Sequence, residues 1–498
     1  MGPAMLQSGP RGRGSAYSDG ETTDQFTEVY AVKCILFLAD SVNRRFLDLY
    51  CASGVHLPNL DRLVQRSVTF TNHWTGSAPC MPARRDIMTG RLNFLERNWG
   101  GIEPFDYTLP EALRTGGIHS HIITDHYHYF EAGGENYCNS FDTWELNRGQ
   151  EWDQWIAQLN REVPIPAHYG TMRAQYVLNR SMFQHDELSY PSVKTIHGAA
   201  QWLERHHDAD QFLLWVEPFD PHEPYDVPQK YLDMLQDDYD DLLYMWPDYQ
   251  PVENCHMPAE KCIKHIRNRC KALMLMMDHW LGRIFDVMDA HDMWRDTMFL
   301  FTTDHGFLLG EHGFMGKTYM PAYNEEFHIP LIVHLPGDVG AGTRCGALTQ
   351  NIDILPTVMD FFGISDSCLP NRLHGKSWIP LIRKETDRLR DAVLYGQFGK
   401  QMNLTDGQYT YFRAPTAENQ PLNVYTAMPT DAPPFNYYRP ARLKDLSRIT
   451  AAPYLSWNPY PVYRIPADII KCPDIEHPMQ LGFERLDPCH RPCGHPAQ

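Results

Sequence analysis

The chain has 498 residues, of which 43% are hydrophobic and 12% aromatic, so it can build a packed core and is not a disordered protein. Lys and Arg number 44 against 62 Asp and Glu, and the net charge of −18 excludes a protein that binds nucleic acid through a broad basic surface. An anionic small substrate is not excluded, because a cluster of basic side chains and a cation reverses the sign of the charge inside a cleft.

Residues 1–30 are rich in Gly, Ser, Asp and Thr and lack the apolar core of a secretory signal, so we expect a flexible tail. The longest apolar runs, such as 34–39, are far shorter than the ~20 residues that span a bilayer. The 12 cysteines are scattered along the chain, as is typical of reduced thiols rather than of a disulfide framework. Together with the charge, these features predict a cytoplasmic protein with neither a membrane nor a nucleic-acid partner.

Residues 31–384 alternate between strand-like and helix-like segments. Short apolar runs predict strands at 34–39, 118–124, 212–216, 298–302 and 329–335. Helices are predicted between them at 59–66, 108–115 and 271–288. This alternation predicts an α/β fold with a mostly parallel central sheet sandwiched by helices.

After about residue 385 the composition changes, and the length of the chain also suggests a second unit, since one core usually stops growing at ~250–300 residues. Prolines and tyrosines cluster at 432–438, and short β-like pieces at 393–398 and 408–413 are separated by a turn. We therefore expect a smaller C-terminal subdomain with an antiparallel sheet over 385–498. Its terminal cysteines, Cys489 and Cys493, fit no standard zinc-finger spacing.

The most informative stretch is 80–91, which reads Cys-Met-Pro-Ala-Arg-Arg-Asp-Ile-Met-Thr-Gly-Arg. Pro82 suits the first turn of a helix and Gly90 suits its end. Cys80 would then lie at the helix N-terminus, where backbone N–H groups favour an anion, with Arg84 one turn later. A lone cysteine would be better interpreted as a buried structural residue. The whole string, however, resembles the signature of the sulfatase family.

This resemblance, which spans about residues 31–380, implies an alkaline-phosphatase-like fold and a hydrolase of sulfuric esters. It also implies that a separate formylglycine-generating enzyme oxidises Cys80 to formylglycine. A hydrated aldehyde carries two hydroxyls on one carbon, so one attacks the ester and the other expels the bound group by re-forming the aldehyde. A serine or an unmodified cysteine has no such second hydroxyl.

Carboxylates follow two of the predicted strands, at Asp40 and at Asp304. In open α/β sheets, ligands collect at these carboxyl ends, although a lone Asp after a strand is more often a helix cap. The order of these residues is similar to that of the family, and the resemblance implies one divalent cation, Ca²⁺ or alternatively Mn²⁺ or Mg²⁺. Its ligands would be Asp40, Cys80, Asp304 and His305.

Two further segments complete the resemblance. Residues 219–225 contain a Pro-His-x-Pro run, by which His222 would serve as a general acid or charge stabiliser near the leaving-group oxygen. The plainer interpretation is a loop histidine in a proline-rich turn. Lys317 resembles the family lysine that neutralises the anionic group. The implied catalytic residues are Cys80, Arg84, His222 and Lys317.

The chain departs from the family pattern at two places. Ser41 stands where many members have a second aspartate, which predicts weaker Ca²⁺ binding or another metal preference. Thr124 and Asp125 stand where many members have Gly-Lys, so one sulfate contact is missing. His126 and His128 are the expected substrate-binding residues at this segment.

Three functions remain open at this point. The first is a sulfuric ester hydrolase, and the second is a phosphonate monoester or phosphodiester hydrolase with the same nucleophile, which Ser41 and Asp125 favour slightly. The third is a catalytically silent binding protein, which predicts loss of the nucleophile or of metal ligands. We expect loops 133–155 and 237–256, rich in aromatic and acidic residues, to select the alcohol half of the substrate and to disfavour polyanions.

Overall fold

The computed structural model describes residues 32–130, 136–159, 161–370, 372–415, 422–428, 446–466 and 482–485. The predicted tail at 1–30, the segment 432–438 and the terminal cysteines Cys489 and Cys493 lie outside these ranges. Among helices in the described ranges, none combines the length and the apolar character that crossing a bilayer requires.

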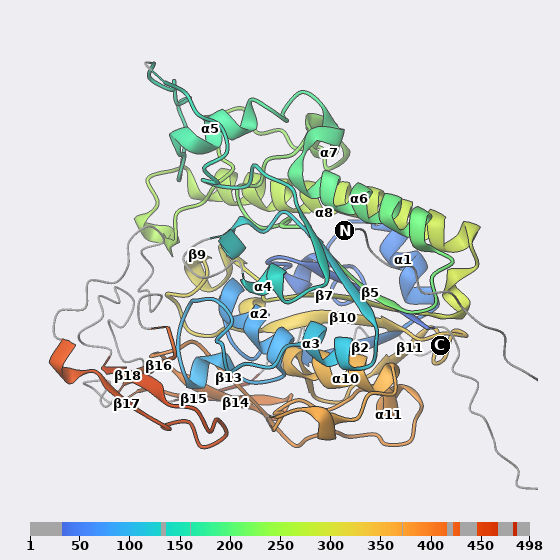
Figure 1. Cartoon of the computed structure of the whole chain (residues 1–498). Helices are drawn as coiled ribbons and strands as arrows, with labels where there is room; N and C mark the ends of the chain where they lie inside the picture. Colours follow the sequence, from blue (N-terminus) through green and yellow to red (C-terminus); the bar gives the residue numbers. More distant parts are fainter. Residues whose placement is uncertain are drawn as a thin grey trace, which may run out of the picture.

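A central sheet forms the middle layer of the molecule (Figure 1). Within the described ranges its nine strands follow the order β11-β2-β10-β7-β1-β5-β3-β4, with β12 paired to β2. Strands β7, β1, β5, β3 and β4 are parallel neighbours, whereas β10 runs antiparallel between β2 and β7. The predicted mostly parallel sheet is therefore confirmed. The strands are β1 (Lys33–Ala39), β2 (Val68–Trp74), β3 (His119–Thr124), β4 (Thr143–Leu146), β5 (Phe212–Glu217), β7 (Thr297–Thr303), β10 (His328–His334), β11 (Thr343–Cys345) and β12 (Thr349–Gln350).

Helices cover both faces of this sheet (Figure 1). Strand β1 explains why, since every one of its residues is buried: Ile35 and Phe37 belong to one apolar core, and Cys34 and Leu36 belong to the other. The first core includes α1 (Pro58–Gln65), α6 (Pro191–His206), α7 (Gln229–Met234) and α8 (Ala259–Ala290). The second includes α2 (Cys80–Thr89), α3 (Leu109–Thr115), α10 (Ile354–Phe361) and α11 (Ile379–Ile382). Shorter helices are α4 (Asn136–Asn139), α5 (Ala174–Arg180) and α9 (Asn324–Phe327).

The predicted helices and strands of this part all form. Helix α3 begins with the capping box of Thr108 and Glu111, and α2 ends at Gly90, whose left-handed backbone (φ 65°) stops the helix. Helix α8 starts twelve residues before the predicted 271–288, at Ala259, because its first turns carry charged residues on a partly exposed face and lack a long apolar run.

Smaller antiparallel sheets follow in the C-terminal part (Figure 1). One contains β13 (Val393–Gly396), β14 (Met402–Thr405), β15 (Tyr409–Arg413) and β19 (Gly482–Arg485), and another contains β16 (Asn423–Thr426), β17 (Thr450–Ala452) and β18 (Val462–Pro466). Gly396 accepts a backbone hydrogen bond from Ala78 and donates one to Gly76. The C-terminal sheet thus supports the segment that leads into α2. A third small sheet of β6 (Gln250–Pro251), β9 (Phe314–Gly316) and β8 (Leu308–Leu309) lies before residue 385.

The central position of β1 gives a first prediction. Leu36→Ala is expected to lower the free energy of unfolding by about 2–5 kcal/mol, because the cavity forms in a core that cannot collapse around it. Leu404→Ala, on the exposed face of β14, should change it by less than about 0.5 kcal/mol. Urea denaturation of the two variants measures both values, and equal losses would contradict the assignment of β1 to the centre of the sheet.

Candidate active site

Three acidic side chains meet where three neighbouring parallel strands end. Asp40 follows β1, Glu217 is the last residue of β5, and Asp304 follows β7, and all three are fully buried. Because β7, β1 and β5 are adjacent in the sheet, their carboxyl ends lie side by side. The chain leaves β1 through Ser41, which has a left-handed backbone (φ 61°) and donates its N–H to Oδ1 of Asp304 over 3.0 Å.

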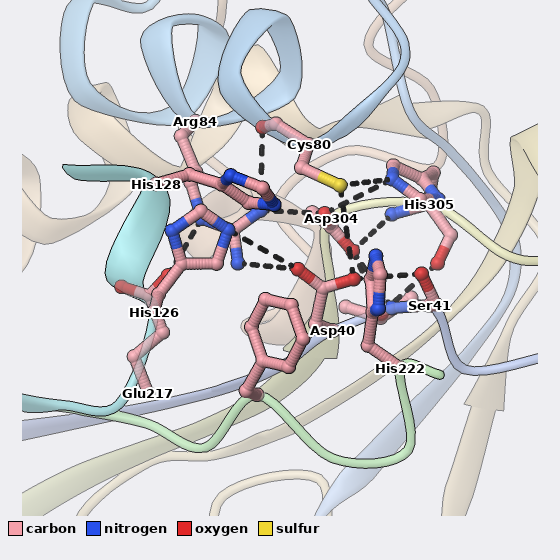
Figure 2. Close-up of polar contacts among 12 residues, drawn as sticks. Asp40, Ser41, Cys80, Arg84, His126, His128, Glu217, His222, Asp304 and His305 are labelled. Carbon is pink, nitrogen blue, oxygen red and sulfur yellow. Dashed lines mark hydrogen bonds and ion pairs between the residues drawn. The ribbon is translucent and has the colours of Figure 1, made fainter. Parts of the chain in front are cut away.

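The guanidinium of Arg84 joins these three carboxylates (Figure 2). Its Nε donates to Oε1 of Glu217 over 2.6 Å, its Nη1 to Oδ2 of Asp304 over 2.6 Å, and its Nη2 to Oδ2 of Asp40 over 2.9 Å. Burial by itself lowers the pKa of Arg84, but the charges of Glu217, Asp304 and Asp40 outweigh it and raise that pKa. The guanidinium is therefore a permanent positive charge inside the protein. Burial raises the pKa of Glu217 to about 7.

Cys80, the first residue of α2, places its thiol beside this charge cluster. Its Sγ lies 3.9 Å from Oδ1 of Asp40, 3.2 Å from Nε2 of His305 and 3.3 Å from Nζ of Lys317. Burial, followed by the charge of Asp40, raises the pKa of the Cys80 thiol well above its ordinary value. An unmodified thiol at this position is therefore neutral at pH 7 and a poor nucleophile.

The predicted metal ligands come together in one group. One ligand atom from each of Asp40, Cys80, Asp304 and His305 lies within 4.8 Å of the others, and all four residues are buried. Nδ1 of His305 donates to the carbonyl oxygen of Gly306 over 2.8 Å, so Nε2 is the nitrogen that faces Cys80. Burial lowers the pKa of His305 to about 4, which keeps the ring neutral. Two carboxylates and a neutral imidazole are a suitable donor set for a divalent cation.

Lys317 and His222 lie on the other side of the Cys80 thiol. Nζ of Lys317 donates to Nε2 of His222 over 2.7 Å and to Oγ of Ser41 over 3.2 Å. Burial by itself lowers the pKa of Lys317. The interaction with the side chain of Cys80, followed by those with the carboxylates of Glu223, Asp40 and Asp304, outweighs burial and raises that pKa. The structure thus brings the four predicted catalytic residues, Cys80, Arg84, His222 and Lys317, into one site.

The two predicted substrate-binding histidines have different surroundings (Figure 2). His126 is buried with Nε2 3.5 Å from Oδ2 of Asp40, and neither of its ring nitrogens has a hydrogen-bond partner among the described residues. His128 lines the pocket described below, and its Nε2 lies 3.1 Å from Oε2 of Glu151. His128 is therefore in reach of a bound ester, whereas His126 lies next to the predicted metal ligands.

Asp125 is not part of the site, contrary to the weight that the sequence gave it. Its carboxylate accepts hydrogen bonds from Gln150 (2.7 Å), Ser192 (2.6 Å) and Thr195 (3.0 Å), and so joins the end of β3 to α6. Burial raises the pKa of Asp125 to about 6. Because its carboxylate is engaged by these hydrogen bonds and does not line the pocket described below, it gives no reason to prefer a phosphorus ester.

A pocket of ≈ 370 Å³ opens onto Cys80, His222 and Lys317, a size that suits a small ester. Both predicted loops contribute to it: the described part of 133–155 supplies Glu151 and Trp152, and 237–256 supplies residues from Trp246 to Tyr249. The guanidinium of Arg173 lies over the ring of Trp152, 4.1 Å from its centroid. The remaining wall is mostly aromatic and acidic and includes Trp99, Glu223 and Tyr319.

Sequence reasoning missed three acidic residues of the site. Glu217 ends β5, the same position that drew attention to Asp40 and Asp304, so the strand-end argument could have found it. Glu151 and Glu223 flank the two histidines of the pocket, and no pattern in the sequence marks them, because their pairing with these rings arises only in the folded loops.

Comparison with known proteins agrees with this geometry. The family model described as Sulfatase matches residues 33–364. The chain is similar to an arylsulfatase of Clostridium perfringens (22% identity, covering 74% of this chain and 82% of the relative) and to a choline-sulfatase of Rhizobium meliloti (25%, 76% and 77%). Its fold is similar to that of the phosphonate monoester hydrolase of Agrobacterium radiobacter, with a TM-score of 0.58, 20% identity, and coverage of 77% and 87%.

The close packing of Gly306 gives a prediction for the metal group. A Cβ at Gly306 would lie 1.9 Å from the backbone oxygen of Glu325, so Gly306→Ala must displace the loop that carries Asp304 and His305. We expect it to weaken the binding of Ca²⁺ or Mn²⁺, measured by calorimetry, by about 10- to 100-fold. The control is Gly198→Ala, whose Cβ meets only ordinary contacts at 3.9 Å in α6. Equal affinities in both variants would contradict this ligand assignment.

Proposed function

The chain belongs to the sulfatase family and is a hydrolase of sulfuric esters, and from this premise we propose that its nucleophile is a formylglycine made from Cys80, assisted by one divalent cation. The maturation partner would be a formylglycine-generating enzyme. The observation that carries this proposal is the position of the Cys80 side chain. Cys80 lines the pocket, and its Sγ lies within 3.3 Å of both His305 and Lys317.

The surroundings of Cys80 support the cation as well. The carboxylates of Asp40, Asp304 and Glu217 share a single guanidinium in a buried site, so each is only partly neutralised by Arg84. Asp40, Asp304, His305 and the side chain at position 80 would hold the ion, which when bound polarises the ester oxygens as a Lewis acid. We propose Ca²⁺, with Mn²⁺ or Mg²⁺ as alternatives.

The other residues have distinct tasks in this proposal. Lys317 would bind a charged oxygen of the ester, because its ammonium points to the place of the nucleophile. Arg84 would keep Asp40 and Asp304 apart from each other and oriented, since each carboxylate gives one oxygen to the guanidinium. His222, on the pocket side of Lys317, would face the leaving alcohol.

A second candidate is a phosphonate monoester or phosphodiester hydrolase with the same nucleophile. Ser41 favours it, because this serine replaces the family's second aspartate and its Oγ lies between Asp40 (2.6 Å) and Lys317 (3.2 Å). Phosphodiesters and sulfate monoesters both carry a single negative charge, so the charge of the site does not separate the two substrates.

A hydrolysis assay separates these functions. The protein, co-expressed with a formylglycine-generating enzyme, would be given an aryl sulfate, an aryl phosphonate and a bis-aryl phosphodiester with Ca²⁺ or Mn²⁺. We expect the sulfate to be the best substrate by kcat/KM, and Cys80→Ala to lose at least about 10⁴-fold of this activity, because the covalent step is removed.

Higher turnover of the phosphorus esters, lost in the same variant, would assign the protein to the second candidate. Turnover that survives Cys80→Ala would contradict the proposed nucleophile. The absence of turnover with all three esters would leave either a narrower natural substrate or the silent binding protein.

A further inference from the structure

We propose that Glu223 is a positioning residue for His222: its backbone carbonyl orients the imidazole, and its carboxylate stabilises the ring when it is charged, so that Nε2 delivers a proton to the departing alcohol. The inference rests on the proposed function and adds a residue to its machinery. It is carried by the contacts of the two ring nitrogens of His222 and by an oxygen of Glu223 that lacks a hydrogen bond.

The first contacts are those of Nδ1, the nitrogen that faces away from the nucleophile. Nδ1 of His222 donates to the backbone carbonyl oxygen of Glu223 over 2.6 Å. The carboxylate of Glu223 is also near, with its Oε2 3.2 Å from Nδ1 of His222. Oε1 of Glu151 lies 3.9 Å from the same nitrogen. Since Nδ1 carries a hydrogen, Nε2 is the nitrogen left for proton transfer.

The second observation is the state of the Glu223 carboxylate. Glu223 is 1% exposed, and its Oε1 accepts a hydrogen bond from the hydroxyl of Tyr249. Its Oε2 has no hydrogen-bond partner among the described residues. A buried carboxylate oxygen without a partner is costly, and a positive charge on the neighbouring ring offsets that cost. The imidazolium of His222 is such a charge, and it would arise only during the reaction.

The third observation is the contact of Nε2, which prevents a positive charge on the ring in the free enzyme. Nζ of Lys317 donates to Nε2 of His222, so the ring accepts a hydrogen bond there and is neutral. An anionic ester that accepts the hydrogen bond of the Lys317 ammonium would leave Nε2 of His222 without it. Nε2 could then take a proton from solvent in the pocket. Lys317, Glu223, Glu151 and, farther away, Asp40 are the charged groups that face the ring.

The proton transfer then balances. Sulfur forms its new bond to the nucleophile oxygen at position 80 as its bond to the alcohol oxygen breaks. The electron pair of the broken bond stays on the alcohol oxygen, which takes the proton from Nε2. The electron pair of the N–H bond returns to the ring, and His222 is again neutral. Nδ1 keeps its hydrogen throughout, bonded to the carbonyl of Glu223, while the carboxylate stabilises the ring only in its charged form.

The test measures how kcat/KM depends on the leaving group. The wild type and Glu223→Gln would be given a series of aryl sulfates. The series runs from the 4-nitrophenyl ester, whose phenolate leaves with little protonation, to the 4-methylphenyl ester, whose phenolate needs more. This substitution keeps the backbone carbonyl contact and removes the charge. We expect a loss of about 100-fold for the 4-methylphenyl ester and of less than about 3-fold for the 4-nitrophenyl ester.

Two further variants show whether Glu223 acts through His222. We expect His222→Ala to have the same steep dependence, and Glu223→Gln to cost nothing more in that background. Asp237→Asn is the matched control, because it removes the charge from another buried carboxylate–histidine pair (Oδ2 to Nδ1 of His265, 2.5 Å) that does not line the pocket. It should leave the dependence unchanged.

A loss of equal size for all leaving groups, or additive losses in the double variant, would overturn the inference. Should Glu223→Gln fail to fold in a thermal melt, Glu223→Asp replaces it: the retained charge predicts a shallow dependence, and a steep one overturns the inference. A wild type that cleaves none of these esters overturns the proposed function and the inference with it. An active wild type whose Gln variant has an unchanged dependence overturns the inference alone.

Discussion

Arg84 and its three carboxylates are the interaction on which the rest of the site depends. The arginine lies one turn into α2, and Asp40, Glu217 and Asp304 come from the ends of β1, β5 and β7. Charges this deeply buried are tolerated only when they are paired, and removing one partner of such a group costs about 3–5 kcal/mol. The pairing therefore ties the start of α2 to three strands of the sheet. Cys80, one turn before Arg84, is thereby held where the strand ends meet.

Acidic and basic groups lie on opposite sides of the Cys80 side chain. Asp40, Asp304 and His305 lie on the sheet side, where they suit a cation, and Lys317 lies on the pocket side, where it suits an anion. Beyond Lys317 come His222 and the carboxylates that flank it. This arrangement explains how a protein with a net charge of −18 accommodates a negatively charged ester. Two of the acidic residues of the pocket wall, Glu151 and Glu223, lie against histidine rings.

The sequence predicted most of the fold because the buried strands and the capped helices have strong local patterns, as in β1 and α3. Asp40 and Asp304 were found because they follow predicted parallel strands and because their order is similar to that of the family; the strand-end rule alone also reaches Glu217. The sequence did not show what Asp125 contacts, since its carboxylate accepts hydrogen bonds from hydroxyls of α6 that lie about 70 residues further along the chain. Glu151 and Glu223 were not predicted for a similar reason. They lie in irregular loops, where no regular spacing of residues indicates which way a side chain points.

The central claim is that the residue at position 80 is a formylglycine in the active protein. Mass spectrometry of the peptide containing residue 80, from protein purified from its native host, tests this most directly. We predict a peptide in which an aldehyde has replaced the thiol, and which reacts with a hydrazine reagent. An unmodified cysteine in protein that still hydrolyses sulfuric esters would contradict the account.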